Sequence, residues 1–473
     1  MNRTQRILAA GALLLTPAFA YIRLSYTEAG GAVVPIQRND NKGIQYYIND
    51  KIVPGATSTA IGASVKVVSE ASDPVTGIRE AFAQWGRVSG DLKFLPLKPT
   101  TALHDINDGK STVVFASTAD DLAAMGYSPG RNSGAIAITA NVWYQEEGST
   151  PNGTVVKKGD IADSDILLNS SGLLFSTDGS TAFDVQTVLT HELGHALGQD
   201  HTGLLGSTMF QFSAVGTSAV LAQRLISSDE RAFVAAIYPA GGAALGTITG
   251  KVTLAGAEVK RALVTLTDVN AGVTLGTLTG TNGVYSLAVP PGSYIVSAEP
   301  FNQIVTPANV SLDAASVTTG YQHTFAGGAT PTTVNVASGA TGTADFAVSA
   351  AGGGLTLPFT AIGVANGSRD ISSVNGIGGP YVIASGQSVD IAFLGGGFDA
   401  TTTVRVFGAG ISVRAGSTRV DPGVNFPQGP QRPHRQIFKV ADWRGDDEER
   451  AGHVLSASVS IIRGCPRSPD ASL

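Results

Sequence analysis

Residues 191–201, which read HELGHALGQDH, constrain this chain more than any other stretch. The chain has seven histidines, and His191, His195 and His201 all fall within this segment. Side chains four residues apart share one face of a helix, so His191 and His195 point the same way. Gly198 tolerates the left-handed conformation that reverses a chain after its last helical turn, and that reversal can return His201 to the same point. The stretch predicts a helix, a turn and three imidazoles around one metal ion.

Glu192 has a different part in this motif. It lies about 100° around the helix from its neighbour His191, where it can reach a metal-bound water without being a ligand. Three imidazoles and one water form the open arrangement of a catalytic zinc site, in which the metal lowers the pKa of the water. Glu192 would take the proton of that water and pass it to a leaving amine. The sequence therefore predicts one zinc ion and hydrolysis of peptide bonds without a covalent intermediate.

An amphipathic helix with incidental histidines is the alternative interpretation. The HExxH pattern by itself arises by chance in about 1 chain in 100. The added glycine and third histidine make that coincidence rarer by a further factor of roughly hundreds, which favours the metal site.

Several segments around the motif resemble the matrixin branch of the metzincin zinc proteases. The resemblance covers about residues 44–240 and is carried by IQYYIN, IREAFAQW, DGKSTVVF, DSDILLN, FDVQTVLTHELGHALGQDH, STMF and SSDERAFVAAIYP. It implies an α+β catalytic domain with a twisted mixed sheet and three helices. It also implies a peptide substrate that lies antiparallel to an edge strand, here residues 136–139. The residue roles that it implies are zinc ligands His191, His195 and His201, general base Glu192, and a structural Met-turn at Met209.

Two features of the vertebrate members of that family have no counterpart in this sequence. Residues 145–165 contain no histidine, so we do not expect the second, structural zinc of that loop. The one cysteine of the chain is Cys465, so no cysteine upstream of the catalytic helix can act as a latency switch. The turn with Asp105, Asp108 and Gly109 is either a calcium site or a solvated turn, since it lacks a full calcium-loop pattern.

The N-terminus has the three regions of a secretory signal peptide in order. Arg3 and Arg6 supply the positive charge, residues 7–15 form a short apolar run, and Ala18-Phe19-Ala20 is a cleavage site of the A-x-A type. An uncleaved anchor is the alternative, but the apolar run is short for a bilayer. We expect cleavage near Ala20 and a secreted, extracellular or periplasmic protein without a transmembrane segment.

Charge and cysteine content exclude other classes of protein. The net charge is −6 and no basic block occurs, so we expect no nucleic-acid partner. A single cysteine cannot build an internal disulfide framework in an exported chain. The domains must therefore rely on apolar cores and any bound metal.

The catalytic domain is expected to span residues 44–242, after a loose lead-in over residues 21–43. Alternation and β-branched residues predict strands at 44–49, 92–95, 112–115, 135–139 and 166–168. Helices are predicted from Asp73, from Thr181 as N-cap of the catalytic helix with Asp184 three residues later, and over residues 228–238.

All-β sandwich modules are expected to follow the catalytic domain. Residues 246–302 resemble the carboxypeptidase regulatory-like, prealbumin-related module, on the basis of Gly283, Tyr285, Pro291, Gly292 and Tyr294. Residues 303–355 are a linker or degenerate strands, and residues 356–420 resemble an Ig-like β module. Residues 421–473 are a charged, disordered tail, or the product of a shifted reading frame.

The favoured function is a secreted zinc metalloendopeptidase that acts on peptides or proteins, with cell-surface or matrix contact through the β modules. The alternative is a surface-binding or adhesion protein whose metal domain is catalytically inactive. Glu192 argues against that alternative, because a purely structural site needs no base. A polysaccharide-binding role for the modules is compatible with the enzyme, although their low aromatic content does not favour it.

Overall fold

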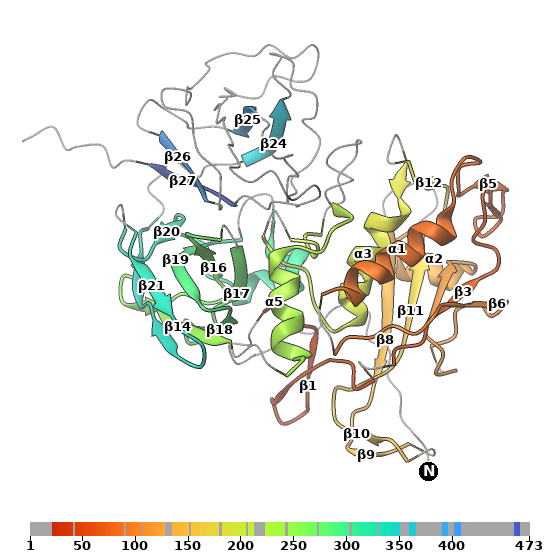
Figure 1. The fold of residues 1–473 in the computed structure, drawn as a ribbon, viewed down its shortest axis with the longest axis horizontal. Helices are drawn as coiled ribbons and strands as arrows, with labels where there is room; N and C mark the ends of the chain where they lie inside the picture. Colours follow the sequence, from red (N-terminus) through yellow and green to blue (C-terminus); the bar gives the residue numbers. More distant parts are fainter. Residues whose placement is uncertain are drawn as a thin grey trace, which may run out of the picture. The chain divides into compact units, whose positions relative to one another are not determined.

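The computed structural model describes residues 21–350, apart from 41–42, 89–90, 107, 128–134, 151–152, 179–181, 205–206, 212–222, 242–244, 272–273, 302–304 and 329–330, and four later strands. The chain divides into two compact units. Unit 1 contains Met1–Ala244 and a short later segment, Pro307–Ala314. Unit 2 contains Leu245–Thr306 and Ala315–Leu473. Figure 1 shows the helices in the first unit and strands in both.

A five-stranded sheet forms the centre of unit 1, in the order β6-β3-β7-β11-β8. Four strands run parallel and β8 runs antiparallel to β11 at one edge. The edge position of β8 agrees with the strand expected at residues 136–139. The bounds are β3 (Tyr47–Asn49), β6 (Lys98–Thr100), β7 (Thr112–Phe115), β8 (Ala137–Trp143) and β11 (Ile161–Leu168).

The strand predicted at residues 92–95 is wrong. Phe94 makes only an isolated bridge with Ile44, and the strand that pairs with β3 is β6. Pro96 lies between them in the sequence. Pairing resumes at Lys98 in β6, an edge strand that itself contains Pro99.

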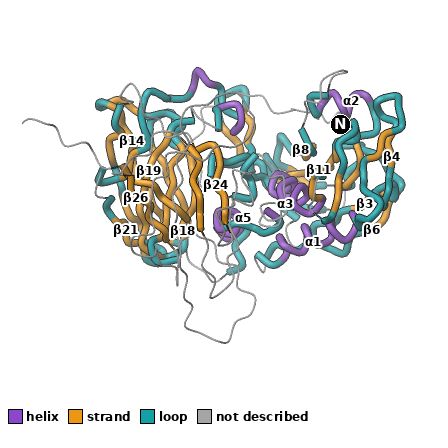
Figure 2. The backbone as a smooth tube through the Cα atoms, turned by 90° about the horizontal axis from the view of Figure 1, so that it is seen from above, coloured by secondary structure: helices purple, strands orange, loops and turns teal. Residues whose placement is uncertain are grey.

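Helices α1 (Pro74–Gly86) and α3 (Val185–Ala196) lie side by side (Figures 1 and 2), and Trp85 of α1 donates from its indole nitrogen to the carbonyl of Thr190 at 2.8 Å. Asp73 caps α1 as predicted, by accepting from the N–H of Thr76 at 3.0 Å. Asp184, and not Thr181, caps α3, and Thr181 lies outside the described residues. Further helices are α2 (Ala119–Ala124), which was not predicted, and α5 (Ser228–Ile237).

The segment predicted as a loose lead-in is part of the core of unit 1 from Tyr21 onward. Its strands β1 (Ser25–Thr27) and β2 (Val33–Pro35) pair with each other. Arg38 is buried, and its guanidinium donates to the hydroxyl of Tyr46 at 3.0 Å and to the carbonyl of Ala196 at 3.1 Å. Irregular spacing of the buried residues hides this order from a search for periodic patterns. The small remaining strands are β4 (Thr57–Ser58), β5 (Val65–Lys66), β9 (Gly148–Ser149), β10 (Val155–Val156), β12 (Phe175–Ser176) and β13 (Phe183–Asp184).

Two five-stranded sheets lie in unit 2, one around β14 and one around β19. Buried residues alternate along β14, as expected when one face of a sheet is covered. Its strands are β14 (Gly246–Leu254), β15 (Ala257–Glu258), β16 (Leu263–Asp268), β17 (Thr274–Leu278), β18 (Val284–Val289) and β19 (Gly292–Glu299). From the segment between residues 303 and 355 the sheets take up β20 (Thr324–Phe325), β21 (Thr333–Val336), β22 (Thr341–Thr343) and β23 (Phe346–Val348).

Four later strands form two antiparallel pairs. They are β24 (Phe359–Ala365) with β25 (Asp390–Gly395), and β26 (Thr402–Phe407) with β27 (Ser458–Arg463). The last strand lies inside the segment predicted as a disordered tail, so these six residues differ from that prediction. The Ig-like identity and the domain limits stay predictions. No helix among the described residues is long and apolar enough to cross a membrane.

Candidate metal centre

Helix α3 places two of the three motif histidines. Its N-cap Asp184 accepts from the N–H of Thr187 at 2.8 Å, and Arg224 pairs with the same carboxylate. The helix ends at Ala196, and Gly198 follows with φ +89°. A Cβ on Gly198 would also lie 2.1 Å from the carbonyl oxygen of Ile36, so the backbone conformation and the close packing both require glycine.

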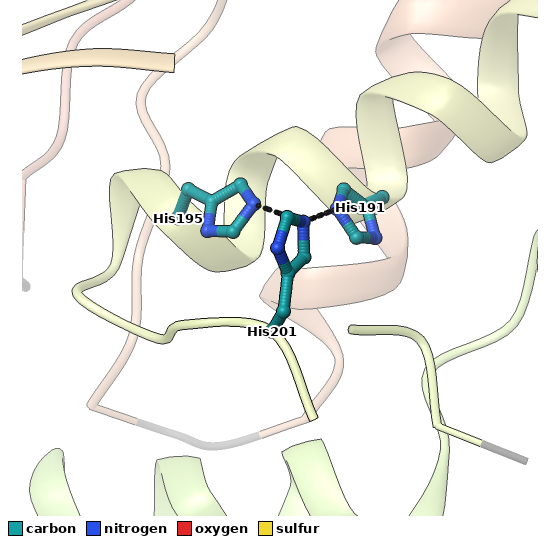
Figure 3. A group of neighbouring side chains, drawn as sticks. All are labelled: His191, His195 and His201. Carbon is teal, nitrogen blue, oxygen red and sulfur yellow. Dashed lines mark hydrogen bonds between the residues drawn. The ribbon is translucent and has the colours of Figure 1, made fainter. Parts of the chain in front are cut away.

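The chain then returns His201 to the two helical histidines, as Figure 3 shows. The Nε2 atom of His201 lies 3.2 Å from Nε2 of His195 and 3.2 Å from Nε2 of His191. One ligand atom from each imidazole lies within 4.8 Å of the others. The three side chains that the sequence brings together by spacing therefore converge in space.

The hydrogen bonds on the far side of the rings decide what occupies the space between them. Nδ1 of His191 faces the carbonyl oxygen of Thr208 at 2.8 Å, and Nδ1 of His195 faces that of Gln199 at 2.8 Å. A carbonyl oxygen only accepts, so each Nδ1 carries the hydrogen and each Nε2 presents a lone pair. Nitrogen lone pairs at this separation repel one another unless a cation lies between them. The donor set fits a zinc ion, which imidazole nitrogens bind in this way.

Burial keeps the three imidazoles neutral. Burial, together with the neighbouring imidazoles, lowers the pKa of His191, His195 and His201 to about 3 in each case. Only the neutral form has a free ring nitrogen for a metal. The site is thus ready to bind a cation at neutral pH without first losing protons.

Glu192 lies on α3 beside these ligands and is nearly buried. Its Oε2 accepts from the hydroxyl of Thr139 on β8 at 2.7 Å. Burial raises the pKa of Glu192 to about 7, while the hydrogen bond from Thr139 acts in the opposite direction. A carboxyl group with such a pKa can gain and lose a proton near neutral pH, as a general base and acid must.

Residues 62–238 match the matrixin family model. The match supports a zinc metalloprotease-type domain and peptide or protein substrates, and the matrixin family implies zinc in the histidine site. No curated protein matches the chain.

Several solved structures also match, and two of them are described as DUF3823 family proteins. One, from Parabacteroides merdae ATCC 43184, aligns with 47% of this chain and 82% of its own at 11% identity and TM-score 0.16. The other, from Bacteroides ovatus ATCC 8483, aligns with 46% of this chain and 81% of its own at 12% identity and TM-score 0.15. These TM-scores are too low to support an argument about fold or function.

Met209 of the matrixin-like domain lies fully buried against α3. A Cβ on Gly194 would lie 2.1 Å from its sulfur, so helix and methionine touch with no side chain between them. The carboxylate of Glu230 on α5 fixes the turn that contains Met209. It accepts hydrogen bonds from the N–H of Thr208 at 3.0 Å, from the N–H of Met209 at 3.2 Å and from the hydroxyl of Ser207.

Residues outside the sequence motifs also make hydrogen bonds with the histidines of the matrixin-like site. Asn141 of β8 donates to the carbonyl of His195 at 3.0 Å. The backbone of Asn309 makes a hydrogen bond with the ring of His201. Alternation along β8 predicts a strand but does not say that Thr139 faces Glu192, and nothing in the sequence links residue 309 to residue 201.

The acidic turn predicted as an alternative calcium site is not a metal cluster in the described part of the chain, where the histidine triad is the one such group. Its backbone instead donates to two buried aspartates: the N–H of Asp105 to Asp165 at 3.2 Å, and the N–H of Gly109 to Asp163 at 3.1 Å. Calcium at this turn stays an untested prediction.

Proposed function

We propose that this chain is an exported zinc metalloendopeptidase that cleaves peptide bonds in peptides or proteins. The observation that supports it best is the convergence of three Nε2 lone pairs beside a buried carboxyl group of raised pKa. A purely structural zinc site is closed by four ligands and needs no such carboxyl group. In this proposal His191, His195 and His201 hold the ion, Met209 supports them, and Glu192 does the proton chemistry.

The chain's own residues account for the movement of protons. Bound zinc supplies Lewis acidity toward a water molecule and a peptide carbonyl. Glu192 accepts one proton from the attacking water as its oxygen bonds to the carbonyl carbon, and delivers it to the amine nitrogen as the C–N bond breaks. Thr139 holds the carboxylate for this transfer through its 2.7 Å hydrogen bond. Among the described residues β8 is the last strand of its sheet, and its outer edge offers backbone groups to an extended substrate.

Export and the role of the β modules are further parts of the proposal. The signal-peptide pattern at residues 1–20 supports export. The kinship of residues 246–302 to carboxypeptidase regulatory-like modules, and contact with a cell surface or matrix, rest on sequence resemblance alone.

Zinc content and cleavage of a quenched peptide library, measured on wild type and Glu192→Gln side by side, test the function. We expect one zinc per chain in both proteins and cleavage by wild type only, with a loss of at least about 100-fold in kcat/KM for the variant. Wild-type rates in Glu192→Gln would refute Glu192 as the base. Zinc in both proteins with cleavage by neither would favour the surface-binding alternative.

A further inference from the structure

The segment Pro307–Ala314, here called the strap, belongs to unit 1, although the residues on both sides of it belong to unit 2. It begins with a short 3-10 helix, Pro307–Val310, and proline suits the first position of such a turn. The strap lies far beyond residues 62–238, which match the matrixin model. Its contacts are therefore a property of this chain rather than of the matched region.

Two contacts connect the strap to the third histidine. The ring of His201 makes a hydrogen bond with the backbone of Asn309. Because Nε2 of His201 faces the other two histidines, the nitrogen that remains for Asn309 is Nδ1. The hydroxyl of Ser311 donates to Oδ1 of Asp200 at 3.2 Å, and the same oxygen accepts from the N–H of His201 at 2.7 Å.

A buried side chain anchors the strap between these contacts. Val310 is 1% exposed, whereas its neighbours Ala308 and Ser311 are exposed. The N–H of Leu312 donates to the carbonyl of Pro307 at 2.9 Å and closes the turn. Ser311 has φ +54°, a conformation that costs a non-glycine residue free energy and persists when surrounding contacts fix it.

The three histidines are held in the same way by carbonyl groups of different origin. His191 uses the carbonyl of Thr208, and His195 uses that of Gln199, both close in sequence. His201 uses the strap. A partner on the second ring nitrogen fixes the tautomer and the orientation of a ligand imidazole, and its loss weakens metal binding.

We propose that the strap is a positioning element of the metal centre, which orients His201 through Asn309 and Ser311. The inference rests on the proposed zinc site but not on peptidase activity. The 21–242 region would, on this basis, form an incomplete metal centre by itself.

Zinc affinity of the full chain, measured by chelator competition on zinc-free protein, tests the strap. Val310→Asp places a charge at the buried anchor and should displace the strap, because a buried unpaired charge is strongly unfavourable. We expect a 10–100-fold weaker zinc affinity. Ala308→Asp, the same charge at an exposed position of the same segment, and the conservative Val310→Ile should bind zinc like wild type. Wild-type affinity in a folded Val310→Asp protein would overturn the proposal.

Ser311→Ala provides a test that does not depend on the folding of Val310→Asp. Zinc raises the melting temperature of a protein that binds it in the folded state. We expect Ser311→Ala to melt like wild type without zinc and to gain less from zinc. An equal gain in both proteins would contradict the positioning role. Both measurements concern zinc binding. A wild-type protein that binds zinc but cleaves no peptide would therefore refute the proposed function without affecting the inference about the strap.

Discussion

One hydroxyl group fixes the orientation of Glu192. Thr139 Oγ1 lies 2.7 Å from the carboxylate and 2.9 Å from the backbone carbonyl of the same glutamate, so β8 and α3 are joined at the reacting group. The hydroxyl has one hydrogen to donate, and the charged carboxylate is the stronger acceptor of the two.

Thr139→Val keeps the shape of the side chain and removes this donor. A hydrogen bond to a charged group contributes about 1.5 kcal/mol or more, so we expect kcat/KM to fall about 10-fold with zinc content unchanged. Thr139→Ser should stay close to wild type, because it keeps the hydroxyl. Steady-state kinetics on a single fluorogenic peptide give the comparison, and equal rates in Thr139→Val and wild type would show that Glu192 needs no such partner.

Asp163 is another buried carboxyl group, and it does not contact the three histidines' metal-binding atoms in any described hydrogen bond. Burial, together with the charge of Asp165, raises its pKa to about 7. It accepts from the N–H of Gly109 at 3.1 Å and from that of Ser164 at 2.8 Å. Since the folded-state pKa lies above the unfolded value, the protonated group adds stability at low pH, and this contribution is lost as pH rises through about 7.

Asp163→Asn should therefore gain stability relative to wild type as pH rises from about 5 to about 8. The upper limit of this gain is about 3 kcal/mol, because only about two pH units, from pH 5 to the folded pKa of about 7, contribute at 1.36 kcal/mol each. Urea denaturation of both zinc-loaded proteins at several pH values measures it, and titrating groups that do not interact with Asp163 cancel in the difference. A stability difference that stays constant from pH 5 to pH 8 would show that Asp163 is already ionised in the folded protein at pH 5.

At the scale of elements, α3 and the methionine turn meet through Gly194. A Cβ there would lie 2.1 Å from the sulfur of Met209 and 3.1 Å from its terminal methyl group. Met209 is fully buried and its N–H is held by Ser207 and Glu230, so the side chain has little room to move away.

Gly194→Ala should lower the free energy of unfolding by about 1–3 kcal/mol, the usual cost of overpacking. In a Met209→Ala background the same change should be neutral or stabilising, because alanine is the better helix former by about 1 kcal/mol. A double-mutant cycle by chemical denaturation gives the coupling free energy. Additive effects of the two substitutions would show that the contact is not tight.

The helix predictions that the structure confirms rest on strong local sequence signals. Asp73 followed by proline predicted the start of α1, and the motif spacing predicted α3, its terminal glycine and three converging histidines. Partners that depend on tertiary contacts could not be predicted this way. Thr139, Glu230 and Asn309 become neighbours of the site only when β8, α5 and the strap pack in place. Likewise the partner strand of β3 lies a few residues beyond the apolar pattern at 92–95, because strand pairing depends on tertiary contacts.

At the scale of the whole molecule, the first described residue is part of the core. Tyr21 is 1% exposed and packs edge-on against Phe233 of α5, with ring centroids 6.0 Å apart. The carbonyl of Ile22 accepts from the N–H of Asp200 at 3.0 Å, and the N–H of Leu24 donates to the carbonyl of Gly198 at 2.9 Å. Residues 21–24 thus lie along the turn that leads to His201.

N-terminal sequencing of the exported protein should therefore give Tyr21 as the first residue. Processing further along, inside residues 21–38, would remove side chains that contact the metal-site turn and should lower both stability and zinc affinity. A native N-terminus beyond Arg38 in an active protein would contradict this part of the proposal.

The strap also bears on how such proteins can diversify. A catalytic domain that ends at α5 could be exchanged between genes as a self-sufficient cassette, with any downstream module attached. Here recombination that replaced the sequence after α5 would also replace the residues that face His201 and Asp200. The metal-site domain and the β-rich unit would then be inherited together, and a similar domain followed by other C-terminal segments would need a different group to orient the third histidine.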